Sequence, residues 1–113
     1  MKRYRFLREA LEEYEDAISY YEDAISYYEN ARSGLGHRFA DEVERVIALT
    51  LEFPEMGAPV AGTPPELRVR RRLVRRFEVE IDYLVSDDTI IVLAVFHCKR
   101  RPGYWKERLR QFR

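Results

Sequence analysis

A repeated heptad in the first third of the chain most constrains its fold. Residues 14–20 read Tyr-Glu-Asp-Ala-Ile-Ser-Tyr, and residues 21–27 repeat that segment without a change. Identity over a whole heptad indicates a duplication, natural or engineered. Seven residues turn an α-helix through about 700°, so an apolar face returns to within about 20° of itself. The repeat therefore lengthens an amphipathic helix without rotating its apolar face.

The helix that contains the repeat is predicted to run from about residue 8 to residue 33. Over residues 2–7 apolar and polar residues alternate, which predicts a short strand. From residue 8 on, apolar residues recur every three or four positions, which marks the start of the helix. Ser33-Gly34-Leu35-Gly36 is predicted to end it, because glycine readily adopts the left-handed conformation of helix termini. The apolar stripe consists of Leu7, Ala10, Leu11, Tyr14, Ala17, Ile18, Tyr21, Ala24, Ile25, Tyr28 and Ala31.

A second helix is predicted before Pro54, which ends it because proline lacks an amide proton. Its apolar face consists of Phe39, Val43, Val46, Ile47 and Leu51. This helix spans roughly 25 Å and the first roughly 37 Å, at about 1.5 Å per residue. One heptad of the first helix thus exceeds what a compact hairpin needs. We expect it to overhang, loop out or mediate self-association through Tyr21, Ile25 and Tyr28.

The remainder of the chain is dominated by strand patterns. Residues 54–66 are rich in proline and glycine and are predicted to form a loop. The elements expected after it are strands over residues 68–74, 77–85 and 90–96, a turn at 86–89 and a short helix at 104–111. The order β-α-α-β-β-β(-α) predicts an α+β fold. We expect a helical hairpin on one face of a mostly antiparallel four-stranded sheet.

Composition and charge narrow the class of protein further. The chain has 113 residues, which suits one domain over residues 1–113. Residues 1–56 carry 7 basic and 13 acidic side chains, whereas residues 57–113 carry 13 basic and 7 acidic ones. This asymmetry suggests either a one-sided interaction surface or two sets of charges that partly neutralise each other in the fold. A single cysteine, Cys98, and the lack of a long apolar segment favour the cytoplasm and no association with a membrane.

Ordered segments along nearly the whole chain resemble the RelE/ParE toxin superfamily, specifically its ParE-like plasmid-stabilisation branch. The matching segments are Glu9-Ala10-Leu11-Glu12-Glu13, Tyr27-Tyr28-Glu29, Gly34-Leu35-Gly36, Phe39, Glu42-Val43, Phe53-Pro54, Arg76-Phe77, Ile81-Asp82-Tyr83, Val95-Phe96-His97 and Arg101-Pro102-Gly103-Tyr104-Trp105. Their order and spacing carry the resemblance. The chain departs from the family pattern in the extra heptad and in Glu78, which stands where proline is expected.

The resemblance implies the toxin of a type II toxin–antitoxin module, held inactive by a cognate antitoxin protein. Family members act in two ways: ParE types bind and poison DNA gyrase, and RelE types cut messenger RNA in the ribosome. Membership alone does not choose between these targets. A third hypothesis is a chain inactivated or engineered through its repeated heptad.

Candidate functional residues come from the basic half of the chain. Clustered arginines suit contacts to phosphate or carboxylate groups. The candidates for binding a substrate or partner are Arg70, Arg72, Arg75, Arg76, Arg100 and Arg101. Cleavage of RNA would also need a group that moves a proton. The candidate catalytic residues are His97, Tyr104 and Arg76.

Structural roles compete with these catalytic assignments. His97 can fix the end of the central strand through a hydrogen bond, and Tyr104 with Trp105 can pack the C-terminal segment. No metal or cofactor motif is present in the sequence, so neither is expected. The basic residues form no compact acid–base set at a recognisable spacing. We therefore rank gyrase binding above ribosome-dependent cleavage of messenger RNA.

Overall fold

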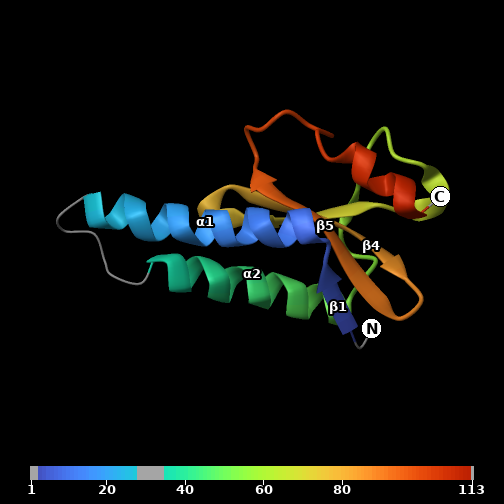
Figure 1. Ribbon diagram of the computed structural model, residues 1–113. Coiled ribbons are helices and arrows are strands. Elements are labelled where there is room, and N and C mark those ends of the chain that lie inside the picture. The colour runs from blue at the N-terminus through green and yellow to red at the C-terminus, as the bar shows by residue number, and fades with distance from the viewer. Residues whose placement is uncertain (1–2, 28–34, 113) are drawn as a thin grey trace.

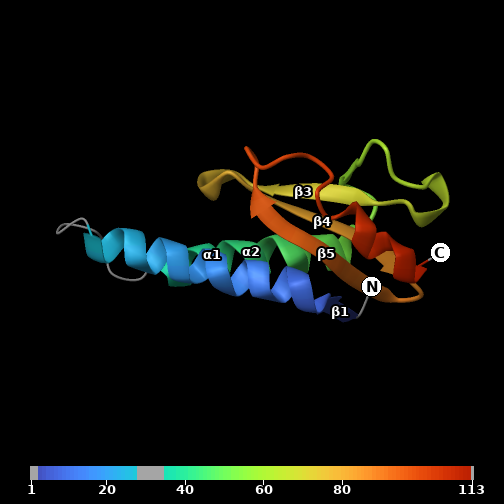
Figure 2. The same cartoon turned by 45° about the horizontal axis from the view of Figure 1, so that its top comes forward.

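The computed structural model describes the backbone of residues 3–27 and 35–112, with the side chains of all these residues except 23–27 and Leu35. Two helices cover one face of a five-stranded sheet, and a C-terminal segment lies against the other face (Figure 1 and Figure 2). The main elements are β1 (Arg3–Phe6), α1 (Arg8–Tyr27), α2 (Leu35–Glu52), β2 (Ala58–Pro59), β3 (Arg70–Val74), β4 (Val79–Ser86) and β5 (Thr89–His97). The predicted α+β class with a helical hairpin is confirmed.

The sheet has the strand order β1-β5-β4-β3-β2, with β1 parallel to β5 and the other pairs antiparallel. Four strands were expected, and β2 is a fifth, two residues long, within the segment predicted to be entirely loop. Pro59 is tolerated there because β2 lies at the sheet edge, where a missing amide proton leaves no ladder bond unmade. The prediction of an uninterrupted loop is wrong for these two residues.

Short 3₁₀ turns also shift three predicted boundaries. Turn η1 (Pro65–Leu67) delays β3, and turn η2 (Arg75–Phe77) delays β4. Each turn is followed by a residue with positive φ, Arg68 at 51° and Glu78 at 52°. The final helix predicted at residues 104–111 is a 3₁₀ helix instead, η3 (Lys106–Phe112).

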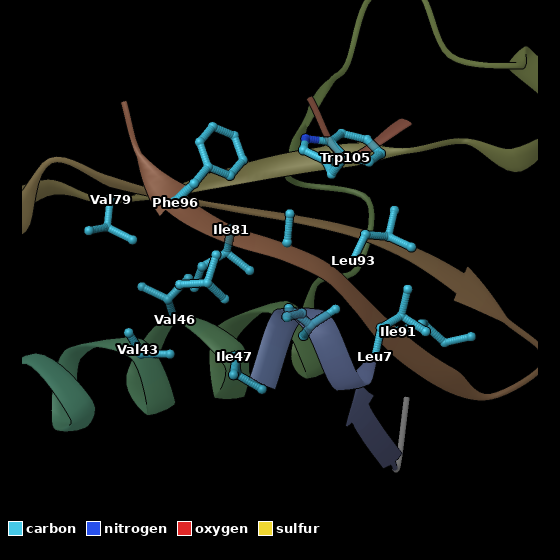
Figure 3. Packing of buried hydrophobic residues seen from close by; sticks show 14 of the residues in the cluster. Leu7, Val43, Val46, Ile47, Val79, Ile81, Ile91, Leu93, Phe96 and Trp105 are labelled. Atoms are coloured by element: carbon cyan, nitrogen blue, oxygen red, sulfur yellow. The ribbon is translucent and has the colours of Figure 1, made fainter. Parts of the chain in front are cut away.

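The hydrophobic core lies on both sides of the central strands. In Figure 3, Val43, Val46 and Ile47 of α2 lie below the sheet, and Phe96 and Trp105 lie above it. Most predicted core positions of both helices are buried or packed against this core. Leu11 is an exception, since 42% of it is exposed although it was placed in the apolar stripe. The stripe of α1 is therefore narrower than its sequence pattern indicates.

The repeated heptad places two tyrosines against one phenylalanine of α2. Tyr14 and Tyr21 occupy the same position in the two copies, and their rings lie 6.0 and 5.0 Å from the ring of Phe39. Tyr21 also packs on Phe77 and donates a hydrogen bond to its carbonyl oxygen at 2.9 Å. Tyr21 thus serves the chain's own core. Of the other residues predicted for self-association, the Ile25 side chain and Tyr28 lie outside the described part of the chain.

Gly36 was expected to help end the first helix but instead lies in the first turn of α2. A β-carbon added to Gly36 would lie 2.4 Å from Cγ of Glu22, so a larger residue would force this glutamate side chain to move. Glu22 of α1 and Gly36 of α2 therefore lie against each other in the described part of the hairpin. The predicted continuation of the first helix to residue 33 lies outside the described residues.

Deleting residues 21–27 is expected to change the free energy of unfolding by less than about 1 kcal/mol, because the core packing is restored by the residues that follow. Tyr28 and Glu29 would take the places of Tyr21 and Glu22. The chain between this glutamate and Gly36 would then be six residues, 30–35, instead of thirteen, 23–35, and six residues suffice for a helix–helix connection. Urea denaturation of both chains measures this difference.

The same pair of chains tests self-association through the repeat. If the extra heptad joins two copies of the chain, deleting residues 21–27 should lower the mass of the protein in solution and leave the free energy of unfolding of the monomer unchanged. A decrease of several kcal/mol would instead show that the repeat belongs to the fold.

Strand β5 contains a β-bulge close to the point where its pairing with β1 ends. Asp82 pairs with Ala94 and Tyr83 with Val92, so Leu93 has no opposite residue in β4. The amide of Leu7 donates to the carbonyl of Val92, and this bond ends the pairing of the β1 segment along this edge. Beyond it, side chains replace a partner strand.

Glu13 of α1 makes most of the side-chain contacts at this part of the β5 edge. Its carboxylate accepts a hydrogen bond from the amide of Val95 at 3.1 Å, two from Arg108 at 2.9 and 3.1 Å, and one from the hydroxyl of Tyr104. Arg108 also donates to the carbonyl of Leu93 at 2.8 Å. Glu13 therefore joins α1, the edge of β5 and the C-terminal segment.

Candidate partner-binding site

A groove between α2 and β3 collects most of the clustered arginines. Its volume is about 600 Å³, within the range of ligand-binding clefts. It is lined by Glu42, Arg45, Val46, Leu49, Arg71, Arg72, Leu73, Arg75 and Arg76. We call these nine residues the arginine groove. Five cationic side chains face one carboxylate in it, so the groove is suited to an anionic partner.

Strand pairing and turn η2 together bring the arginines to this groove. Strand β2 pairs only with Arg70 and Arg71, so residues 72–74 form an outer strand edge without a partner among the described residues. Turn η2 then carries Arg75 and Arg76 beyond the end of β3. The cations therefore line an open edge of the sheet on the side where α2 passes.

Three of these arginines form no ion pair with any described residue. Arg45 is paired with Glu42 at 3.2 Å and Arg71 with Glu80 at 3.8 Å. Arg72, Arg75 and Arg76 have no carboxylate within 4.0 Å in the described part of the chain. Their guanidinium groups can each bind a carboxylate or phosphate without first breaking an ion pair.

Three of the nine residues that line the arginine groove are apolar. Val46 and Leu49 come from α2, and Leu73 of β3 is 51% exposed. Protein-binding surfaces combine apolar contact area with polar and charged side chains. The groove thus offers both charge and apolar area to a polypeptide.

The predicted binding residues divide between this groove and other parts of the molecule. Arg72, Arg75 and Arg76 meet in the groove as expected. Arg70 turns away and donates hydrogen bonds to the carbonyls of Glu55 and Gly57, at 2.8 and 2.9 Å, which ties down the loop after α2. Arg70 is thereby already engaged within the fold.

Arg100 and Arg101 lie elsewhere, in the segment that follows β5. The guanidinium carbon of Arg100 lies 3.6 Å from the centre of the Tyr104 ring, and Arg100 Nη1 lies 3.6 Å from Glu13. Arg101 is exposed. These two residues belong to a second cationic surface rather than to the arginine groove.

Tyr104 is held in the Glu13 cluster, away from the arginine groove. Burial, and then its hydrogen bond to the Glu13 carboxylate, raise the pKa of the Tyr104 hydroxyl above its usual range. The hydroxyl therefore stays protonated at neutral pH and donates to Glu13. This arrangement supports the alternative in which Tyr104 packs and anchors the C-terminal segment.

His97 lies at the exposed end of β5, beside Glu78 at 3.6 Å. Its Nδ1 accepts a hydrogen bond from the amide of Lys99 at 3.1 Å, which fixes the turn after the strand. It lines a separate apolar pocket of about 320 Å³ with Ala17, Tyr20, Tyr21, Val79, Val95 and Phe96. Of the three catalytic candidates, only Arg76 lies in the arginine groove, so the structure does not bring them together there.

Sequence reasoning missed Glu13, the most connected carboxylate among the described residues. Its partners Val95, Tyr104 and Arg108 are 82, 91 and 95 residues away in the chain. In the sequence it is one of many acidic residues on the polar face of a helix, so no local signal distinguishes it. Arg45 and Leu73 of the groove were missed for the same reason.

The fold is a small α+β domain with a helical hairpin, and the arginine groove on its surface is cationic and partly apolar. A family model for the ParE toxin of the type II toxin–antitoxin system parDE matches residues 4–102. The chain belongs to this family and is a toxin of a type II toxin–antitoxin system, which implies an antitoxin partner. A comparison with curated proteins found no match. None of the described helices is long and apolar enough to cross a membrane.

Proposed function

We propose that this toxin inhibits growth by binding DNA gyrase in the cytoplasm, and that the arginine groove is the surface that contacts the enzyme. The composition of the groove carries the proposal. Arg72, Arg75 and Arg76 are free to bind, and Leu49 and Leu73 add apolar area. This combination suits attachment to an acidic protein surface.

Among the described residues that line it, the arginine groove holds no group suited to moving a proton. The only carboxylate that lines it, Glu42, is paired with Arg45, and its other lining residues are arginines and apolar side chains. Cleavage of RNA would need an acid–base pair beside the cations that hold the phosphate. Binding without catalysis therefore explains the groove better than ribosome-dependent cleavage of messenger RNA does.

The antitoxin is proposed to neutralise the toxin by covering the same cations. An acidic segment seated in the arginine groove would pair with the free arginines and exclude gyrase. The antitoxin would then inhibit the toxin by occupying its gyrase-binding surface, without a change in the fold of the toxin.

A supercoiling assay tests the gyrase proposal directly. Purified toxin is expected to inhibit gyrase, and R72A/R75A/R76A is expected to need roughly 100-fold more protein for half inhibition. That estimate assumes that the three charged side chains together contribute about 2.7 kcal/mol or more to binding. The matched control R3A/R5A/R8A removes three exposed arginines from β1 and α1 and should inhibit like the unmodified chain.

Two results would contradict the proposal. Supercoiling that is unaffected by the unmodified toxin would remove gyrase as the target. Mapped cuts in ribosome-bound transcripts, absent with the triple variant, would favour the endonuclease alternative.

A further inference from the structure

A second cationic surface lies on the C-terminal segment, outside the arginine groove. Residues 99–112 contain six basic side chains and one acidic one. Five of the basic residues are exposed, and we call them the C-terminal basic strip: Lys99, Arg100, Arg101, Lys106 and Arg110. Figure 1 and Figure 2 show this segment running from the end of β5 along the sheet and into the C-terminal helix.

Three cations of the strip have no acidic partner in the part of the chain that the structure describes. Arg100 shares the carboxylate of Glu13, and Arg110 pairs with Glu107 at 3.0 Å. Lys99, Arg101 and Lys106 have no carboxylate within 4.0 Å among the described residues. Their charge is therefore not neutralised within the described fold.

The C-terminal basic strip belongs to a segment that is packed firmly against the rest of the fold. Trp105 and Leu109 are buried in the core, and the Glu13 cluster holds Tyr104 and Arg108. Cations on a fixed scaffold lose less conformational freedom when a partner binds than cations on a flexible tail.

Two glycines make room for the side chain of Lys106. Gly62 and Gly103 both have positive φ, at 76° and 75°. A β-carbon on Gly62 would lie 2.5 Å from Nζ of Lys106, and one on Gly103 would lie 2.6 Å from its Cε. The side chain of Lys106 thus passes close to Gly62 and Gly103, and Lys106 remains exposed.

The strip differs from the arginine groove in its lack of apolar contact area. Among the described residues, the large exposed apolar side chains include Leu73 of the groove but none in residues 99–112. Protein interfaces depend on buried apolar and aromatic anchors. Binding to a nucleic acid backbone depends on cations that reach phosphates and requires no apolar centre.

We propose that the C-terminal basic strip binds the phosphate backbone of duplex DNA without sequence preference. A toxin attached to gyrase through the arginine groove would then also contact the DNA on which gyrase acts. The strip extends the proposed function but does not require it, because DNA binding is a property of this chain alone.

Fluorescence anisotropy with a labelled 20-base-pair duplex, measured over a series of salt concentrations, tests the proposal. The unmodified chain is expected to bind at low salt, with an affinity that falls as salt rises. K99A/R101A/K106A is expected to bind at least 10-fold more weakly and to reduce the salt slope by about 3, one for each cation removed from a phosphate. The matched control R72A/R75A/R76A removes the same charge from the groove and should retain most of the affinity.

A second variant, K99E/R101E, leaves the packing of Lys106 in place and should also lose binding. Circular dichroism confirms that each variant is folded. The proposal is overturned if the unmodified chain does not bind the duplex, or if both triple variants lose affinity equally. It is also overturned if polyglutamate of equal total charge competes as well as unlabelled duplex does, since the strip would then select acidic protein.

These outcomes are separable from those of the gyrase assay, because no gyrase is present. A chain that binds the duplex but leaves supercoiling unaffected would keep this inference and remove the proposed function. Inhibition of gyrase by a chain that does not bind DNA would do the reverse.

Discussion

Replacing Glu13 by alanine is expected to lower the free energy of unfolding by about 3 kcal/mol, because it breaks a largely buried ion pair. The Glu13 and Arg108 side chains are each 15% exposed. Without the carboxylate, the guanidinium of Arg108, the hydroxyl of Tyr104 and the amide of Val95 are all left without this acceptor. Unpaired buried donors cost more than the net value of the bonds they once made.

Urea denaturation followed by circular dichroism measures this decrease in stability. The neighbouring variant E12A is the matched control, because Glu12 is 66% exposed and meets only Arg8, at 4.0 Å. Its effect should stay within about 0.5 kcal/mol. E13Q keeps an oxygen acceptor without the charge, so it should fall between the two. Equal stabilities of E13A and E12A would show that the cluster contributes nothing to the fold.

The Glu13 cluster also bears on how the edge of β5 is protected. Strand β1 covers this edge only as far as Phe6, opposite Val92. An uncovered strand edge invites pairing with another chain. The carboxylate of Glu13 and the guanidinium of Arg108 satisfy the next amide and carbonyl, so E13A should also expose this edge and promote aggregation.

Local periodicity was sufficient to predict the helices and the central strands. The steps of three and four around Phe39 and Val43 define the apolar face of α2, and both residues are fully buried. The apolar run of β5 likewise predicts a strand covered on both faces, and residues 90–96 are buried. These elements follow from patterns that need only a few neighbouring residues.

The candidate site could be predicted only in part, because its geometry depends on distant pairings. The arginine run indicated a cationic surface, and Arg72, Arg75 and Arg76 do meet in one groove. What separates Arg70 from them is the loop after α2, whose carbonyls it binds. What occupies Tyr104 is Glu13, from the opposite end of the chain.

The burial of Asp82 shows the same limit. In the sequence, Glu78, Glu80 and Asp82 alternate with apolar residues, a pattern typical of a half-buried strand with these three acidic residues on its polar face, yet Asp82 is 1% exposed. The reason is the C-terminal segment, which lays Trp105 over this face of the sheet (Figure 3). The strand pattern carries no information about a cover that comes from elsewhere in the chain, so it does not predict the burial of Asp82.

The burial of Asp82 is also expected to make the free energy of unfolding depend strongly on pH. Burial, and then the neighbouring Glu80 carboxylate, raise the pKa of Asp82 from 3.8 to about 9. Between these two values the folded chain holds a proton that the unfolded chain releases. The free energy of unfolding therefore falls as pH rises from about 4 to about 9, by at most about 1.4 kcal/mol per unit.

Replacing Asp82 by asparagine is expected to remove this dependence, since an amide has no proton to lose over that range. D82N should match the unmodified chain at pH 4.5 and exceed its free energy of unfolding by up to about 4.5 kcal/mol at pH 8. Urea denaturation at several pH values measures the difference, with D88N in the exposed turn as the control.

Parallel curves of the free energy of unfolding against pH for D82N and the unmodified chain would mean that Asp82 is ionised in the fold. Its carboxylate would then need a partner other than Glu80, and Arg71, whose charge lowers the pKa of Asp82, is the cation placed to provide one.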